Sequence, residues 1–173
     1  MDFYDILQAG CGDARAYGPI LGFKAFFIAG EDFSISYSDS KSVNDNSNAV
    51  AGENLKKLAR FARYKRFIIP LSFEIDKFLI SRVKDSEAVL CLPISSITSS
   101  YGFVRARRIR MLQKLYTYAY RSGASVAIAS FSPSKQYMNS REQLLALAKL
   151  IAGNEERARS AISCNALLKG QKM

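Results

Sequence analysis

The chain has 173 residues, 49% of them hydrophobic, and a formal net charge of +10, which argues against wholesale disorder and allows one sizeable core. It contains no histidine, and this excludes Ser-His-Asp and Cys-His catalysis as well as histidine-ligated metal centres. An active site in this chain would have to use carboxylates, lysine, tyrosine or serine.

The first third of the chain alternates short apolar runs with turns. Residues 3–7 and 24–29 are predicted to be strands, and residues 13–21 between them a short helix. Residues 33–37 alternate apolar residues with serine, which predicts a half-exposed strand. Residues 41–52 are rich in Asn, Ser, Asp and Gly and are predicted to form a mobile loop.

The alternation continues through the rest of the chain. The predicted elements are a helix at 53–64, a strand at 66–71, a helical repeat at 73–83, a strand at 88–94, a basic helix starting near Arg105 and ending near Arg121, a strand at 125–130, a helix at 141–151 capped by Ser140, and a last helix from Asn154 to Ile162.

Short apolar strands separated by helices are typical of a parallel sheet covered by helices. The sequence therefore predicts a single α/β domain over residues 1–173. An open doubly wound sheet and a (β/α) barrel both fit, and with only six predicted strands a TIM-barrel-like fold would be abbreviated or irregular.

The charge is unevenly distributed along the chain. Residues 1–52 carry three basic and seven acidic side chains, whereas residues 53–173 carry 22 basic and eight acidic ones. This asymmetry indicates RNA, DNA or an anionic membrane as the partner of the second part. The membrane is the weakest of the three, because the longest uncharged run, residues 88–104, contains Pro93 and several serines.

The start of the chain lacks the basic and apolar segments of a secretory signal. Its three cysteines, Cys11, Cys91 and Cys164, are widely spaced and form no C-x-x-C pair, so we expect small buried side chains in a reducing compartment. These features predict a cytoplasmic protein without a membrane partner.

The stretch Ala88–Arg141 contains no acidic residue. Its eight basic residues are Arg105, Arg107, Arg108, Arg110, Lys114, Arg121, Lys135 and Arg141. Because grouped cations repel one another until an anion neutralises them, the stretch favours a polyanion-binding face. The alternative is a solvated basic face on an ordinary basic protein.

Helical geometry divides these cations further. At about 100° per residue, one side of the helix carries Arg107, Arg110, Lys114, Thr117 and Arg121. The opposite side, Ile109, Leu112, Leu115, Tyr116 and Ala119, is apolar and is predicted to pack onto the sheet. Arg105 and Arg108 lie in the first turn, from which they can reach the carboxyl ends of the strands, where α/β folds bind ligands.

Two pairs of carboxylates offer a different function. Asp2 and Asp5 lie on the first strand, and Glu74 and Asp76 follow the strand at 66–71. Carboxylates near strand ends can hold Mg²⁺, so a metal-dependent hydrolase on a reduced barrel is an alternative. Glu74 and Asp76 equally suit the N-terminus of a helix.

Residues 105–163 resemble protein component 3, the thirty-kilodalton subunit family, of archaeal and eukaryotic ribonuclease P. The matching segments are R-A-x-x-I-R-M-L-x-K at Arg105–Lys114, S-G-A-S-V-A-I-A-S at Ser122–Ser130, L-L-A-L-A-K-L-I-A-G at Leu144–Gly153 and A-R-S-A-I-S at Ala158–Ser163. Residues 1–40 are similar only through F-Y-D at Phe3–Asp5 and a K-A-F-F-I strand. The segment Asn139–Gln143 departs from the family's Arg-Ser-Pro-x-Asp pattern, and Arg141 supplies its positive charge.

The resemblance implies an irregular TIM-barrel-like fold and a non-catalytic subunit of the ribonuclease P holoenzyme, the endoribonuclease that removes 5′ leaders from precursor tRNA. It implies three partners: the ribonuclease P RNA, precursor tRNA and a small partner protein. No cofactor is expected on this chain, and Mg²⁺ is expected in the holoenzyme RNA. The eight basic residues of Ala88–Arg141 are then the predicted RNA contacts, and a stand-alone basic RNA-binding module is a further alternative.

Overall fold

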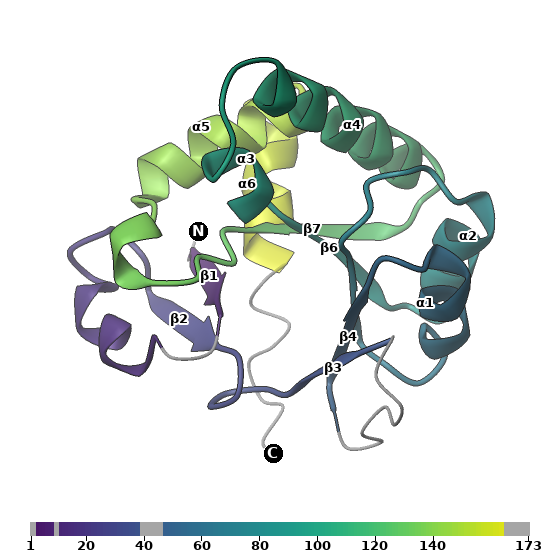
Figure 1. Ribbon diagram of the computed structural model, residues 1–173, viewed down its shortest axis with the longest axis horizontal. Helices are drawn as coiled ribbons and strands as arrows, with labels where there is room; N and C mark the ends of the chain where they lie inside the picture. The colour runs from purple at the N-terminus through teal and green to yellow at the C-terminus, as the bar shows by residue number, and fades with distance from the viewer. Residues whose placement is uncertain (1–2, 9–10, 39–46, 165–173) are drawn as a thin grey trace.

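Parallel strands with helices around them make up the computed structural model, which describes residues 3–8, 11–38 and 47–164 (Figure 1). The strands are β1 (Tyr4–Leu7), β2 (Ala25–Ile28), β3 (Ile35–Tyr37), β4 (Ala49–Gly52), β5 (Phe67–Pro70), β6 (Val89–Pro93) and β7 (Ser125–Ala129). The helices are η1 (Gly12–Tyr17), α1 (Leu55–Phe61), α2 (Lys77–Asp85), α3 (Ser95–Thr98), α4 (Gly102–Arg121), η2 (Lys135–Tyr137), α5 (Arg141–Ala152) and α6 (Glu155–Ser163), where η denotes a 3₁₀ helix.

Strand order follows chain order. β1 and β2 form a two-stranded sheet, β3 to β7 form a five-stranded sheet, and every pairing is parallel. Helices lie in the connections after β4, β5 and β6: α1 and α2 lie together beside the strands, and α4 packs against α5 on another side (Figure 1). The predicted α/β class is therefore confirmed.

The two sheets meet at two narrow seams. After β7, the Phe131 N–H donates to Ile6 O (2.8 Å) and the Gln8 N–H donates to Ser132 O (3.1 Å). Between β2 and β3 a single bridge joins Ala29 to Phe33. Over the residues that the structure describes, the strand ladders do not close into a ring, so the predicted barrel is not confirmed.

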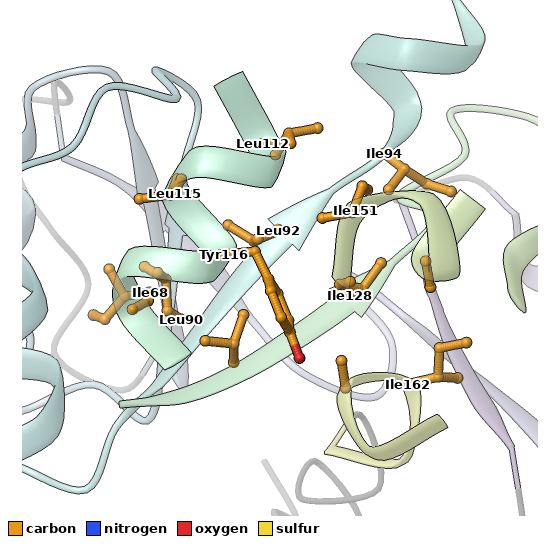
Figure 2. Close-up of a cluster of buried hydrophobic side chains, with 14 of the residues drawn as sticks. Ile68, Leu90, Leu92, Ile94, Leu112, Leu115, Tyr116, Ile128, Ile151 and Ile162 are labelled. Atoms are coloured by element: carbon orange, nitrogen blue, oxygen red, sulfur yellow. The ribbon is translucent and has the colours of Figure 1, made fainter. Parts of the chain in front are cut away.

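Side chains at alternate positions along the strands point to opposite faces and belong to two separate hydrophobic cores. On β5, Ile68 faces the helices, whereas Phe67 and Ile69 belong to a second cluster. The outer core joins strands to helices through Ile68, Leu90, Leu92, Ile94, Leu112, Leu115, Tyr116, Ile128, Ile151 and Ile162 (Figure 2). The inner core draws on both sheets, from Ile6 to Phe131, and contains many small side chains. β1, β4, β5 and β6 are thus buried on both faces, which explains their lack of polar alternation.

Part of the predicted loop at 41–52 is wrong. Ala49–Gly52 is the buried strand β4, paired with both β3 and β5, while residues 41–46 lie outside the described residues. The strand has small residues and follows a polar run, so its composition does not indicate its burial. The short helix α3 is not among the predicted elements, and α2 begins at Lys77 rather than at Phe73. Cys11 and Cys91 are buried, as predicted.

Candidate nucleic-acid interface

The long helix α4 has the two faces predicted for it. Leu112, Leu115, Tyr116 and Ala119 are buried against the sheet and α5. The opposite side carries four exposed basic residues, which we call the α4 stripe: Arg107, Arg110, Lys114 and Arg121. Within the described part of the chain, none of the four side chains forms a hydrogen bond or an ion pair, so their charges are available to an external anion.

The arginines in the first turns of α4 differ from one another in burial and in their contacts. Arg108 is half-buried, and its Nη1 donates to the carbonyl of Ser96 in α3 (2.7 Å). Arg107 and Arg108 line a cavity of about 380 Å³ next to Leu71 and Phe73, just beyond β5. Arg105 is exposed and does not line this cavity. Arg107 and Arg108 thus lie together at a cavity beside the end of β5, and the predicted position of Arg105 near the strand ends stays a prediction.

The remaining two predicted contacts lie away from α4. Arg141 is the first residue of α5, where its guanidinium lies 5.1 Å from the ring centre of Phe3 and its Nε lies 3.5 Å from Glu142 Oε1. This arginine is held by packing and an ion pair, so it contributes less free charge than the stripe. Lys135 belongs to η2, and its side chain lies outside what the structure describes.

A second basic surface surrounds the end of α1. Residues 54–73 contain six basic side chains and no acidic one. Five of the six are exposed, and we call them the α1 cluster: Lys56, Lys57, Arg60, Arg63 and Arg66. The sixth, Lys65, is buried and donates to Ser47 O (2.8 Å). The signal that could have predicted this surface is the same as for residues 88–141, a basic stretch without acidic residues.

Lys84, in α2, lies near the C-terminal end of α4. A Cβ built on Gly123, just after α4, would lie 3.6 Å from Lys84 Cε, so this side chain reaches the end of the stripe at Arg121. Residues 86–88 follow Lys84 and line a shallow cavity together with Arg63 and Arg66. Glu87 is one of these lining residues, so an acidic side chain lies at the edge of the α1 cluster on this side.

The carboxylates predicted for a hydrolase do not assemble. Asp5 is fully buried and is hydrogen-bonded to Ser130. Asp76 accepts a hydrogen bond from Leu79 N (2.9 Å) as the N-cap of α2, which is the structural alternative given for it. Asp2 lies outside the described residues. Over the part of the chain that is described, no three acidic or cysteine side chains gather as metal ligands would, so the site that this alternative needs is not formed.

The aromatic residues around α4 divide between surface and core. Tyr101 and Phe103 are each 82% exposed, at the start of the helix. Tyr116 is buried, and its ring stacks on Tyr120, over which Arg157 lies 4.6 Å from the ring centre. The rings of Tyr101 and Phe103 are therefore exposed enough to stack on an external ring. Among the described residues, no helix combines the length and apolar character needed to cross a membrane.

Comparison with known proteins finds similarity in structure but not in sequence. No family model matches the chain, and no curated protein matches it either. Its fold matches a chain in the cryo-EM structure of archaeal Ribonuclease P with mature tRNA, with a TM-score of 0.69 over 96% of this chain and 80% of that chain. The two sequences are 12% identical, so the likeness shows a shared fold.

Proposed function

We propose that this chain is a non-catalytic protein subunit of ribonuclease P that binds the catalytic RNA and a small partner protein and so supports removal of the 5′ leader from precursor tRNA. The observation that carries the proposal is the shared fold with a chain of an archaeal Ribonuclease P, which covers almost the whole of this chain. The resemblance of residues 105–163 to protein component 3 supports the same function from separate information.

The basic surfaces supply a physical role for such a subunit. Folded RNA brings phosphates together, and their repulsion opposes the compact active form. The α4 stripe places four exposed cations along one helix without an acidic neighbour in the sequence from 88 to 141. Cations that replace condensed counterions bind RNA with a favourable, salt-dependent free energy. In this proposal the Mg²⁺ ions that serve the reaction are held by the RNA, and this chain supports the RNA structure.

We also propose that the strands form an abbreviated, irregular barrel. Strand order follows chain order, and the inner core takes side chains from both sheets. The hydrogen bonds of Ile6 and Gln8 with residues 131 and 132 connect the first strand to the last. These features support a sheet that curves back on itself, with the contact between β2 and β3 as its weakest point.

Omission of this chain from a reconstituted enzyme tests the function. The RNA and the other protein subunits would be assembled with and without the full chain, and the rate of 5′-leader removal measured over a range of Mg²⁺ concentrations. We expect the omission to slow cleavage most at low Mg²⁺, because more Mg²⁺ would then be needed to screen the phosphates. Equal rates at every Mg²⁺ concentration, together with RNA binding by the isolated chain, would instead indicate a stand-alone RNA-binding module.

A further inference from the structure

A cavity of about 520 Å³ opens at the carboxyl ends of the strands. Its walls include Gln8 after β1, Gly30 after β2, Leu71 after β5 and Phe131 after β7, so residues far apart in the chain meet there. This is the end at which parallel α/β folds bind their ligands, and the volume lies in the usual range for small-molecule sites. The function argued above, based on the outer surface of α4, makes no use of this cavity.

The chemistry of the cavity excludes a charged occupant. Among the described residues that line it, none is acidic or basic: they are Gln8, Ala29, Gly30, Ser34, Ile35, Tyr37, Ala51, Ile69, Leu71, Phe73, Pro93, Ser95, Ser96 and Phe131. A buried anion would find no counter-ion there, and a divalent cation would find no carboxylate. Apolar walls with a few amide and hydroxyl groups suit a neutral ring whose edges form hydrogen bonds.

Two arginines line a second cavity that shares one wall with this cavity. Leu71, Phe73 and Ser96 line both this cavity and the cavity that holds Arg107 and Arg108. The Ser96 carbonyl also accepts the 2.7 Å hydrogen bond that orients the Arg108 guanidinium. A neutral, largely apolar pocket is therefore joined to a pair of arginines through a shared wall.

We propose that this cavity accepts one unpaired base of a single-stranded RNA segment, with the phosphate of that nucleotide beside Arg107 and Arg108. A nucleotide combines a flat neutral ring with an adjacent anion, which matches the division between the two cavities. Unpaired RNA bases are commonly recognised by stacking on aromatic side chains, and Tyr37, which is 58% exposed, provides such a ring in the wall. The inference rests on the RNA-binding function proposed above and adds a base-recognition site to it.

The test compares an RNA with and without bases on the full chain. Two fluorescently labelled single-stranded RNAs of about ten nucleotides would be used, one intact and one whose central positions are abasic, because binding sites for single strands span about 4–16 nucleotides. Both carry the same number of phosphates. We expect the wild-type chain to bind the intact RNA about fivefold or more tightly than the abasic one, since stacking of one base contributes about 1–3 kcal/mol.

Two variants test whether the difference in affinity between intact and abasic RNA arises in this cavity. Tyr37→Ala removes an aromatic wall, and Gln8→Trp fills the opening from an exposed position, so both changes are compatible with the fold. Each is expected to remove the difference between intact and abasic RNA while leaving the affinity for abasic RNA and its salt dependence unchanged. Tyr17→Ala, at a tyrosine that is 45% exposed and outside the cavity, is the matched control and should keep the difference.

The outcomes separate this inference from the function on which it rests. Equal, salt-dependent binding of intact and abasic RNA by the wild-type chain would overturn the base site and leave the α4 stripe standing. A base-dependent difference that persists in both Tyr37→Ala and Gln8→Trp would also overturn it. Absence of salt-dependent binding to either RNA would contradict the RNA-binding function itself.

Discussion

Asp5 is a fully buried carboxylate at the seam between β1 and the end of β7. It accepts hydrogen bonds from Ser130 Oγ (2.5 Å), from Ser130 N (2.8 Å) and from Ile6 N (2.8 Å). Burial raises the pKa of Asp5 from 3.8 to about 6, and the hydrogen bonds act in the opposite direction. The residue therefore joins two sheets while carrying a charge that its surroundings disfavour at neutral pH.

The raised pKa predicts a definite dependence of stability on pH. Between pH 3.8 and about 6 the folded chain holds a proton on Asp5 that the unfolded chain has released. The free energy of unfolding should therefore fall as the pH rises through this window, by on the order of 3 kcal/mol, and level off above it. Asp5→Asn keeps a side-chain acceptor but does not titrate.

Urea unfolding of the wild type and of Asp5→Asn at several pH values measures this effect. The difference between the two free energies of unfolding is the readout, since it removes the contributions of the other carboxylates. We expect the wild type to lose stability relative to the variant across the window. Parallel curves for the two proteins would show that Asp5 has an ordinary pKa in the folded state.

At the scale of elements, the N-terminal residues of α4 lower the stability of the helix. No side chain caps the helix, no acidic residue lies in its first turn, and Arg105, Arg107 and Arg108 all lie near that end. Cations there oppose the helix dipole at a cost of a few tenths of a kcal/mol each, roughly. The helix forms because its apolar face packs on the sheet, so the arginines serve something other than helix stability.

Charge reversal on the stripe should weaken RNA binding in a way that salt reveals. We expect Arg107→Glu with Lys114→Glu to lower the slope of log affinity against log salt by about 0.7–0.9 for each phosphate that the variant no longer neutralises. Lys24→Glu with Lys77→Glu changes the net charge equally at exposed sites outside the stripe and is the matched control. Binding by fluorescence anisotropy over a range of salt concentrations measures both slopes. Equal slopes for the two folded variants would remove the stripe from the interface.

At the scale of the whole molecule, the inner core is where the two sheets depend on each other. Its smallest members are Ala29, Ala49, Ala51, Ala127 and Ala129, all buried. These small side chains share the layer with the large rings of Phe33, Phe67 and Phe131, so large and small residues fill it together. Ala127 is fully buried and does not line the cavity at the strand ends, so a larger side chain there has no room without moving a strand.

Enlarging one of these alanines tests the packing. We expect Ala127→Leu to lower the free energy of unfolding by about 1–3 kcal/mol, because overpacking forces strained rotamers or backbone shifts. Ala106→Leu, the same change at an exposed position of α4, should alter it by less than about 0.5 kcal/mol. Urea unfolding of both variants gives the comparison. Similar stabilities would mean that the inner layer is loosely packed.

Local patterns predict much of this architecture, and their failures have physical causes. Ser140 predicts the start of the helix at 141–151, and the structure shows the full capping box with Gln143. The pattern does not predict β4, because a strand of alanine, valine and glycine owes its burial to neighbours on both sides rather than to its own residues. The α1 cluster is different, since its signal, an acid-free basic stretch, is present in residues 54–73.

The sequence by itself determined the α/β class, the position of most elements and the outward direction of the α4 stripe, because these depend on periodicity and capping within a few residues. Only the tertiary structure decided which strands pair, where Asp5 lies and that a neutral cavity adjoins Arg107 and Arg108. Each of these depends on contacts between distant parts of the chain. Asp5 and Ser130 are 125 positions apart, and no local pattern can predict that their side chains meet.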